Sequence, residues 1–329
     1  KFKRKSDGYA PENFIPTQEL GLIPARKALA LSQNLAALRL YNMTLTDHKP
    51  QEYIEKMNFS RISENNLSNL SAALGGGIEM TVEENTAAYA ALANGGQYNP
   101  GYMIEKIVDL DGNVVFEHKV EPTQIYKPET AYIVSDMLKD TLDQGHTGAK
   151  AGSQLRFSRE HVSAKTGTSQ KFHDVWLMGY NPNITLSAWL GYGIPKPLNT
   201  MTNTYGEPSA RVSALWAKLM NTVYATNPDL VSPNTKMAKP ENVVAQSFCG
   251  ISGRLLSSTC SAAGFGVTDL FNKAVFVPTK VDDSIVSSSA VTIGGQKYTP
   301  LKGTPSAFIT NGGIALSPSF AKRMLGSLG

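Results

Sequence analysis

Apolar and polar residues alternate along this chain with two periods, one typical of helices and the other typical of strands. The clearest helical segment opens at Pro208, a residue that the first turn of a helix tolerates well. From there the apolar side chains recur at spacings of three and one: Val212, Leu215, Trp216, Leu219, Met220 and Val223. This spacing predicts a long amphipathic helix. Further helices are predicted at 24–31, at 35–41, at 81–92 behind a Thr81/Glu84 capping box, and after Pro128.

Strand-like runs are concentrated in the middle of the chain. They span residues 161–165, 175–180 and 184–190, and the turn sequence Asn181-Pro182-Asn183 makes the last two an antiparallel hairpin. Another hairpin is predicted around Asp111-Gly112. Helices, then antiparallel strands, then a helix indicate an α+β fold with helices packed on an antiparallel sheet.

The composition of the sequence changes after about residue 230, where prolines mark a linker. The remainder is rich in Ser, Thr, Val and Gly, and contains short strand-like runs such as 290–293. We therefore expect two domains, a main domain at 1–231 and a small β-rich appendage at 232–329, as a chain of 329 residues allows.

Composition excludes several classes of protein. The formal charge of +4 is too small for a dedicated nucleic-acid binder, so no nucleic-acid partner is expected. No run approaches the roughly 20 apolar residues of a membrane span, and no signal peptide is visible at the start. Because the first residue is Lys1 and not Met, we expect the chain to be a piece of a longer protein.

The cysteines, Cys249 and Cys260, lie close together in a Ser/Gly-rich stretch without a nearby histidine. Two interpretations remain open. They are either two unrelated small buried residues or one local disulfide formed in an oxidising compartment. A metal site needs about four ligands, so none is expected here or elsewhere, and no cofactor is implied.

Two short motifs carry candidate chemistry. Lys165-Thr166-Gly167-Thr168 offers a cation, two hydroxyls and a backbone that a ligand can approach closely, which suits a bound carboxylate. Ser32-Gln33-Asn34 offers a hydroxyl and an amide that can relay a proton and hold a substrate amide. Taken singly, the first is an ordinary polar strand end and the second an ordinary helix junction.

In this order, however, the two motifs resemble a known family. Penicillin-binding proteins and class A β-lactamases carry S-x-x-K, then S-D-N, then K-T-G. Ser32-Gln33-Asn34 is similar to a relaxed second element and Lys165-Thr166-Gly167 to the third, and several segments between and around them also resemble class A penicillin-binding proteins. These segments include 28–38, 74–82, 87–96, 164–169, 174–180 and 188–192. The resemblance extends over about residues 9–225.

The first element of the family, S-x-x-K, is missing from its place before Ser32. The sequence Ser319-Phe-Ala-Lys322 fits this pattern, but it lies in the appendage and after the third element, so we interpret it as a coincidence. We expect the nucleophilic serine to lie on a preceding segment of the same polypeptide, which would be a partner of this chain. The chain alone is then expected to be inactive.

The resemblance implies a peptidoglycan D,D-transpeptidase that cross-links stem peptides ending in D-Ala-D-Ala through a serine acyl-enzyme, and that β-lactams acylate. It implies catalytic roles for Ser32 in proton transfer, for Asn34 toward the substrate amide and the absent lysine, and for Lys165 as a source of positive potential. It implies that Thr166 and Thr168 bind the substrate carboxylate and that the N–H of Thr168 is an oxyanion donor. It also implies that Gly167 leaves the strand open to the ligand.

Class A members also carry a glycosyltransferase domain and an N-terminal membrane anchor, which would place this chain at the extracytoplasmic face of a bacterial membrane. The alternative is a non-catalytic relative that binds peptidoglycan without acylation. A separate β-lactamase would not need the β-rich appendage.

Overall fold

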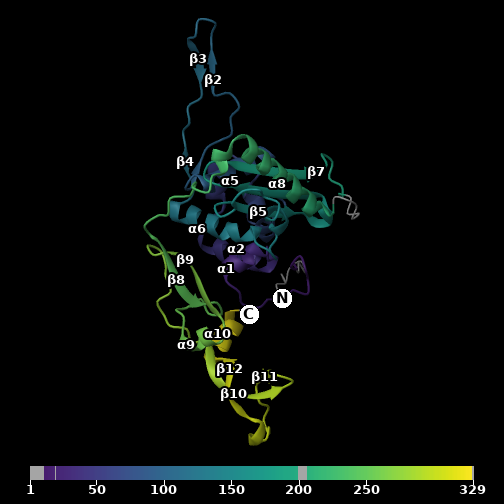
Figure 1. Cartoon of the computed structure of the whole chain (residues 1–329), viewed down its shortest axis with the longest axis vertical. Coiled ribbons are helices and arrows are strands. Elements are labelled where there is room, and N and C mark those ends of the chain that lie inside the picture. Colours follow the sequence, from purple (N-terminus) through teal and green to yellow (C-terminus); the bar gives the residue numbers. More distant parts are fainter. Residues whose placement is uncertain (1–10, 19, 199–205, 328–329) are drawn as a thin grey trace. The chain divides into compact units, whose positions relative to one another are not determined.

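The computed structural model describes residues 11–18, 20–198 and 206–327 of the chain (Figure 1). Its contacts divide into two compact units. Unit 1 comprises Lys1–Glu19 and Ala25–Pro240, and unit 2 comprises Leu20–Pro24 and Glu241–Gly329. The boundary that the sequence predicts after residue 231 stays a prediction. The mixture of helices and antiparallel sheets confirms the predicted α+β class.

Unit 1 is built on a three-stranded antiparallel sheet in the order β5-β6-β7. Its strands are β5 (Ser163–Thr168), β6 (Asp174–Tyr180) and β7 (Thr185–Gly191). The register pairs Lys165 with Met178, and Met178 with Ser187. The predicted hairpin between β6 and β7 is confirmed, whereas the predicted strand at 161–165 begins later and continues through the whole of the Lys165–Thr168 motif.

The core of unit 1 lies between this sheet and the long helix α8 (Pro208–Thr226), as the helical period of its apolar residues predicts. Trp216 and Met220 of α8 are fully buried, and the indole nitrogen of Trp216 donates to the backbone oxygen of Leu186 in β7 at 2.9 Å. Gly179 of β6 lies directly against the Trp216 ring. Burial of these large side chains fixes the sheet on the helix.

The remaining helices of unit 1 follow local signals in the sequence. The helix α5 (Val82–Ala93) begins at a complete Thr81/Glu84 capping box, in which Thr81 Oγ1 accepts from Glu84 N–H and the Glu84 carboxylate accepts from Thr81 N–H. The helix α6 (Pro128–Lys139) begins at a proline. The other helices are α1 (Ala25–Ala30), α2 (Asn34–Asp47), α3 (Gln51–Ile54), α4 (Glu64–Leu67) and α7 (Ala149–Gly152), with short 3₁₀ turns at Glu55–Met57, Leu70–Leu74, Asp140–Leu142, Gln170–Phe172 and Pro228–Val231.

Two small ribbons complete unit 1. The strands β1 (Gln97–Tyr98) and β4 (Thr123–Gln124) pair with each other, and the segment between them carries the predicted hairpin of β2 (Lys106–Val108) and β3 (Val114–Glu117). All residues of β2 and β3 are exposed. Figure 1 shows this hairpin at the end of two long connecting segments.

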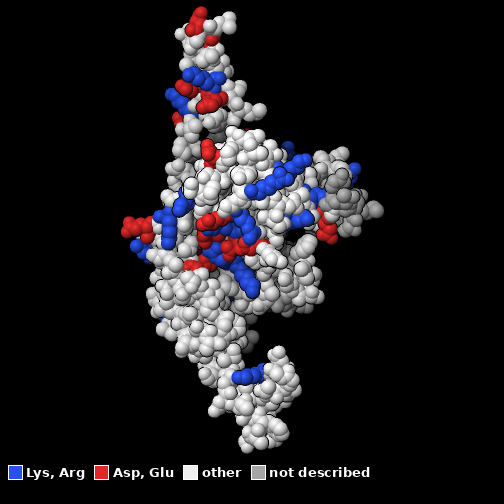
Figure 2. Space-filling view, in the orientation of Figure 1, with Lys and Arg blue, Asp and Glu red and all other residues white. Residues whose placement is uncertain are grey.

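Charged side chains of both signs are visible on one face of the chain. On the face drawn in Figure 2, acidic and basic groups lie side by side and form no patch of a single sign. This distribution agrees with the small net charge of +4. Within the described residues, no helix is long and apolar enough to cross a membrane.

Unit 2 contains two small sheets, in keeping with its β-rich sequence. One pairs β8 (Val243–Cys249) with β9 (Gly266–Asn272), and the other has the order β11-β10-β12. The strands of the second sheet are β10 (Ile285–Ile293), β11 (Gln296–Tyr298) and β12 (Thr310–Leu316), and the helical elements are α9 (Ser258–Ala262), α10 (Pro318–Ser327) and the turn Ser306–Phe308.

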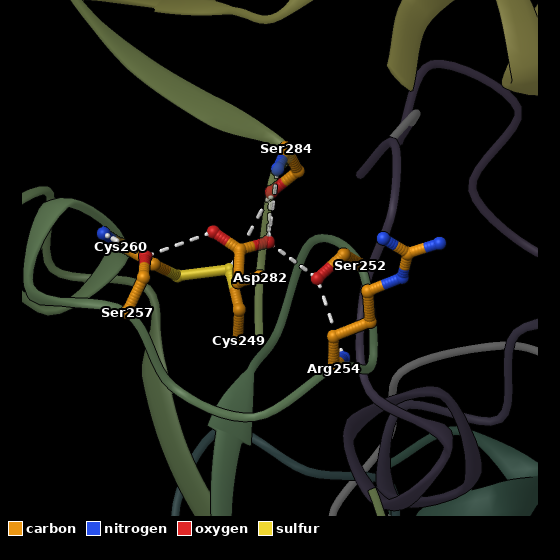
Figure 3. The surroundings of a disulfide bond; sticks show 7 residues. All are labelled: Cys249, Ser252, Arg254, Ser257, Cys260, Asp282 and Ser284. Carbon is orange, nitrogen blue, oxygen red and sulfur yellow. Dashed lines mark hydrogen bonds between the residues drawn. A yellow bond between two sulfur atoms is a disulfide. The ribbon is translucent and has the colours of Figure 1, made fainter. Parts of the chain in front are cut away.

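A disulfide between Cys249 and Cys260 ties β8 to α9, which decides between the two interpretations that the sequence left open (Figure 3). The carboxylate of Asp282 lies beside the bridge and accepts hydrogen bonds from the hydroxyls of Ser252, Ser257 and Ser284 at 2.5, 3.0 and 2.6 Å. The Cys249 and Cys260 sulfur atoms and an Asp282 oxygen lie within 4.8 Å of one another, but the sulfurs are bonded to each other. This cluster therefore has a structural role, because the disulfide cross-links two segments of unit 2.

Candidate active site

Ser32 lies immediately after α1, at the position where helices most often end in glycine. Its backbone adopts the left-handed conformation with φ of 50°. The N–H of Ser32 donates to Leu29 O and the N–H of Gln33 donates to Ala28 O, the two hydrogen bonds of a Schellman C-cap. A serine in this conformation is strained where glycine would not be, so the hydroxyl is retained at some cost in stability.

Lys165 lies in the middle of β5, and its side chain reaches this helix end. The ammonium nitrogen of Lys165 donates to Ser32 Oγ at 2.8 Å and to the backbone oxygen of Thr166 at 3.0 Å. The structure thus brings together the serine of the second motif and the lysine of the third, although 133 positions separate them.

The environment of Lys165 disfavours its charge. Burial lowers the pKa of Lys165 from its usual 10.5 to about 8. No carboxylate forms an ion pair with Lys165 within the described part of the chain. Lys165 therefore keeps a proton near neutral pH but is close to losing it, which suits a group that provides positive potential and takes part in proton transfer.

Asn34, the other candidate catalytic residue, is the first residue of α2. Its side-chain nitrogen donates to the backbone oxygen of Glu12 at 2.9 Å, and no hydrogen bond among the described residues joins it to Ser32 or Lys165. The neighbouring Gln33 is buried and donates to the side chain of Gln18 at 3.2 Å. The segment around residues 12–18 thus covers the start of α2.

The three candidate substrate-binding residues follow Lys165 along β5. Thr166 and Gly167 are half-buried and Thr168 is exposed at the strand end. Neither threonine hydroxyl has a hydrogen-bond partner among the described residues, so both are available to a ligand. A Cβ on Gly167 would lie 3.3 Å from Cβ of Trp176 on the neighbouring strand, so glycine keeps this part of β5 uncrowded.

Supporting contacts that the sequence analysis did not find hold α1 and β5 in place. Arg26 of α1 forms an ion pair with Asp136 of α6, with nitrogen and oxygen 2.6 Å apart. Thr141 Oγ1 donates to the backbone oxygen of Ala164, the residue before Lys165, at 2.8 Å. Asp136 and Thr141 are remote in sequence from both motifs, and no local pattern marks them or Arg26.

Another buried network anchors the far end of the same strands. The hydroxyls of Ser135 and Tyr180 lie 2.7 Å apart, and Ser163 Oγ donates to the backbone oxygen of Ser135 at 2.7 Å. Because α6 is thereby bonded to both β5 and β6, the strand that carries Lys165 has a defined position.

The groups around Lys165 and Ser32 share a recognisable chemistry. A lysine of lowered pKa touches a serine hydroxyl at the edge of an antiparallel sheet, beside a strand end with free hydroxyls and backbone N–H groups. These groups are chemically suited to an anionic ligand and to proton transfer beside it, as in acyl-transfer sites.

Comparison with known proteins places the chain in a family. Residues 6–211 match the family described as "Penicillin binding protein transpeptidase domain". Penicillin-binding protein 1A of Clostridium botulinum is 28% identical over 309 residues, which cover 90% of this chain and 35% of that protein. Penicillin-binding protein 4 of Bacillus subtilis is 31% identical over 191 residues, covering 58% of this chain and 29% of that protein.

Solved structures share the fold of this chain. Penicillin-binding protein 1A from Haemophilus influenzae superposes with a TM-score of 0.68 at 19% identity, covering 85% of this chain and 44% of that one. PonA1 from Mycobacterium tuberculosis gives 0.56 at 23% identity, covering 67% of this chain and 62% of that one.

The chain belongs to the penicillin-binding protein transpeptidase family, as its motif order predicts. It spans about a third of the length of the curated relatives that it matches.

Proposed function

We propose that this chain carries most of the transpeptidase domain of a peptidoglycan D,D-transpeptidase, which cross-links stem peptides and is acylated by β-lactams. The observation that carries the proposal is the contact of 2.8 Å between Lys165 Nζ and Ser32 Oγ, in a chain that matches the transpeptidase family over residues 6–211. The nucleophile is the serine of an S-x-x-K element on a preceding segment of the same polypeptide, next to Ser32 in the assembled site.

In the proposed reaction, the oxygen of that serine attacks the carbonyl carbon of the penultimate D-Ala, and the terminal D-Ala leaves with a proton on its nitrogen. Ser32 passes this proton between the reacting groups, and Lys165 stabilises the negative charge that develops. An amine of a second stem then attacks the ester, and the serine regains its proton. Thr166 and Thr168 bind the terminal carboxylate, the N–H of Thr168 is an oxyanion donor, and Asn34 turns from Glu12 toward the substrate amide.

The context of the protein is part of the same proposal. A glycosyltransferase domain and a membrane anchor precede this chain, which faces the extracytoplasmic side of a bacterial membrane. The similarity to penicillin-binding protein 1A over 90% of the chain supports this organisation.

Fluorescent penicillin tests the proposal directly. The full-length protein should become covalently labelled on a serine that precedes this chain, while the isolated chain should remain unlabelled after denaturing electrophoresis. Lys165→Ala in the full-length protein should slow acylation by a factor of about 100 or more, as the loss of a charge-stabilising group does. A label mapped to a serine of this chain would overturn the proposal, and an unlabelled full-length protein that binds peptidoglycan would favour a non-catalytic module.

A further inference from the structure

The helix that ends at Ser32 is too short to hold its own position. α1 has 6 residues, and isolated helices of fewer than about 12 residues are marginal in water. Among the described side chains of this helix, that of Ala30 alone is buried, so apolar packing contributes little to its placement. The position of Ser32 therefore depends on polar contacts between α1 and neighbouring segments.

Arg26, in the first turn of α1, makes the strongest of these contacts. Its guanidinium donates to the Asp136 carboxylate at 2.6 Å, to the backbone oxygen of Asp136 at 3.0 Å and to the Asp140 carboxylate at 3.3 Å. The Arg26 side chain is only 19% exposed, so these charge-assisted bonds are largely shielded from water and salt. Such a fork fixes both the position and the direction of the helix.

The other end of α1 is bonded to the same region of unit 1. Ala30 O, the last carbonyl of the helix, accepts from the N–H and from the hydroxyl of Thr147, each at 3.3 Å. The carbonyls of a last turn have no partner within their helix, so a donor from outside satisfies this one. The chain from Asp136 to Thr147 thus holds α1 at both ends.

This part of the chain also holds the strand that carries Lys165. Thr141 is fully buried within it and donates to Ala164 O, next to Lys165, at 2.8 Å. The helix α6 is bonded to the start of β5 as well. Ser32 and Lys165 are therefore placed against one another by bonds to a single segment, residues 135–147.

We infer that Arg26 is a positioning residue that sets the spacing between Ser32 Oγ and Lys165 Nζ. Its bonds fix α1 on residues 135–147, the segment on which β5 is also fixed. A displacement of about 1 Å between reacting groups can cost about 100-fold in rate, so the contact of 2.8 Å needs this support. Only the consequence for acylation rests on the proposed function, because the spacing is a property of the fold.

A titration of Lys165 tests the inference without any catalysis. The whole chain is labelled with ε-¹³C-lysine and followed by NMR well below its melting temperature, and Lys165→Met assigns the signal. Ser32→Gly keeps the left-handed turn and removes the hydroxyl. The pKa of Lys165 should then fall by roughly one pH unit, because a hydrogen bond to a charged group favours the charged form.

The decisive comparison repeats Ser32→Gly in an Arg26→Gln background. There it should hardly change the pKa of Lys165, because the contact is already lost. Asp136 keeps its ion pair with Lys139 at 2.7 Å in this variant, so we expect it to fold. The same shift in both backgrounds would overturn the inference, and so would the absence of a shift in the original chain. Lower stability alone would leave the shift intact.

Arg61→Gln is the matched control. Arg61 pairs with Glu79 at 3.5 Å, and the two side chains are 70% and 74% exposed, so this change removes an ion pair elsewhere in unit 1. The Ser32→Gly shift should persist in this background. If Arg26→Gln does not fold, Asp140→Asn takes its place. It leaves the pair of Arg26 with Asp136 and should reduce the shift in part, whereas an undiminished shift would contradict the inference.

Acylation of the full-length protein by penicillin shows what the spacing does. Arg26→Gln should lower the acylation rate constant by a factor of about 10 or more while the non-covalent affinity for penicillin changes less than about twofold. Arg26→Lys keeps a cation and should recover part of the rate, and Arg61→Gln should react normally. An unchanged rate in Arg26→Gln would overturn the inference. A full-length original protein that is never acylated would instead overturn the proposed function, and the titration would still decide the role of Arg26.

Discussion

Ser32 holds its hydroxyl 2.8 Å from the ammonium nitrogen of Lys165, from a backbone conformation that serine rarely adopts. The left-handed turn at Ser32 ends α1 and directs the chain into α2, while β5 presents Lys165 from the edge of the sheet. The contact thus depends on one helix end and one strand, each positioned by other parts of unit 1.

The strain at Ser32 predicts an unusual order of stability between two variants. Ser32→Gly and Ser32→Ala both lose the hydroxyl, but the positive φ at this position strains alanine and not glycine, so the glycine variant should be more stable by about 1 kcal/mol. Urea denaturation followed by tryptophan fluorescence measures this, because Trp176, Trp189 and Trp216 all lie in unit 1. At the exposed Ser68, where φ is −71°, alanine should be the more stable replacement. The same order at both positions would contradict the role of the turn.

The lowered pKa of Lys165 predicts a pH dependence of stability. Because the pKa is about 8 in the folded chain and near 10.5 in the unfolded chain, the unfolded state binds more protons between these values. The free energy of unfolding should therefore rise with pH across this interval, relative to Lys165→Met, by roughly 3 kcal/mol. The cost of burying the charge is fully present below pH 8. Parallel stability curves for the original chain and Lys165→Met would show that this pKa is not lowered.

Close packing of Gly179 on Trp216 predicts a large effect of one methyl group. A Cβ on Gly179 would overlap the ring of Trp216, so Gly179→Ala should destabilise unit 1 by about 2–3 kcal/mol. A Cβ on Gly193 would lie in open space, so Gly193→Ala should change stability by less than about 0.5 kcal/mol. Tryptophan fluorescence during denaturation reports both. Equal effects would mean that Trp216 moves freely away from the sheet.

The disulfide should stabilise unit 2 specifically. Cys249 and Cys260 are 11 positions apart. In the chain-entropy description, a disulfide that closes a loop of this size stabilises the folded state by about 3 kcal/mol. The double variant Cys249→Ala/Cys260→Ala should lower the calorimetric transition of unit 2. The tryptophan transition of unit 1 serves as an internal control and should stay in place.

Much of the local structure could be predicted from the sequence alone. The Thr81/Glu84 box, the proline that begins α6 and the Asn-Pro-Asn turn act through neighbours a few residues away, so their patterns identify α5, α6 and the β6–β7 hairpin. The order of the Ser32 and Lys165 motifs likewise identified the family. The short elements α3, α4 and α7 carry too few residues to show a period, and the β8–β9 pairing depends on contacts remote in sequence.

The tertiary structure decided what those residues do to one another. Only packing brings Lys165 to Ser32, buries it and lowers its pKa, because burial is a property of the folded surroundings and not of the lysine itself. Only the fold pairs Cys249 with Cys260 and leaves Asn99 Oδ1 buried without a partner. The sequence by itself determined the family and the chemical groups of the candidate site, since short local motifs contain both. Distance, burial and charge arise from contacts between residues far apart in the chain, and these the tertiary structure alone decided.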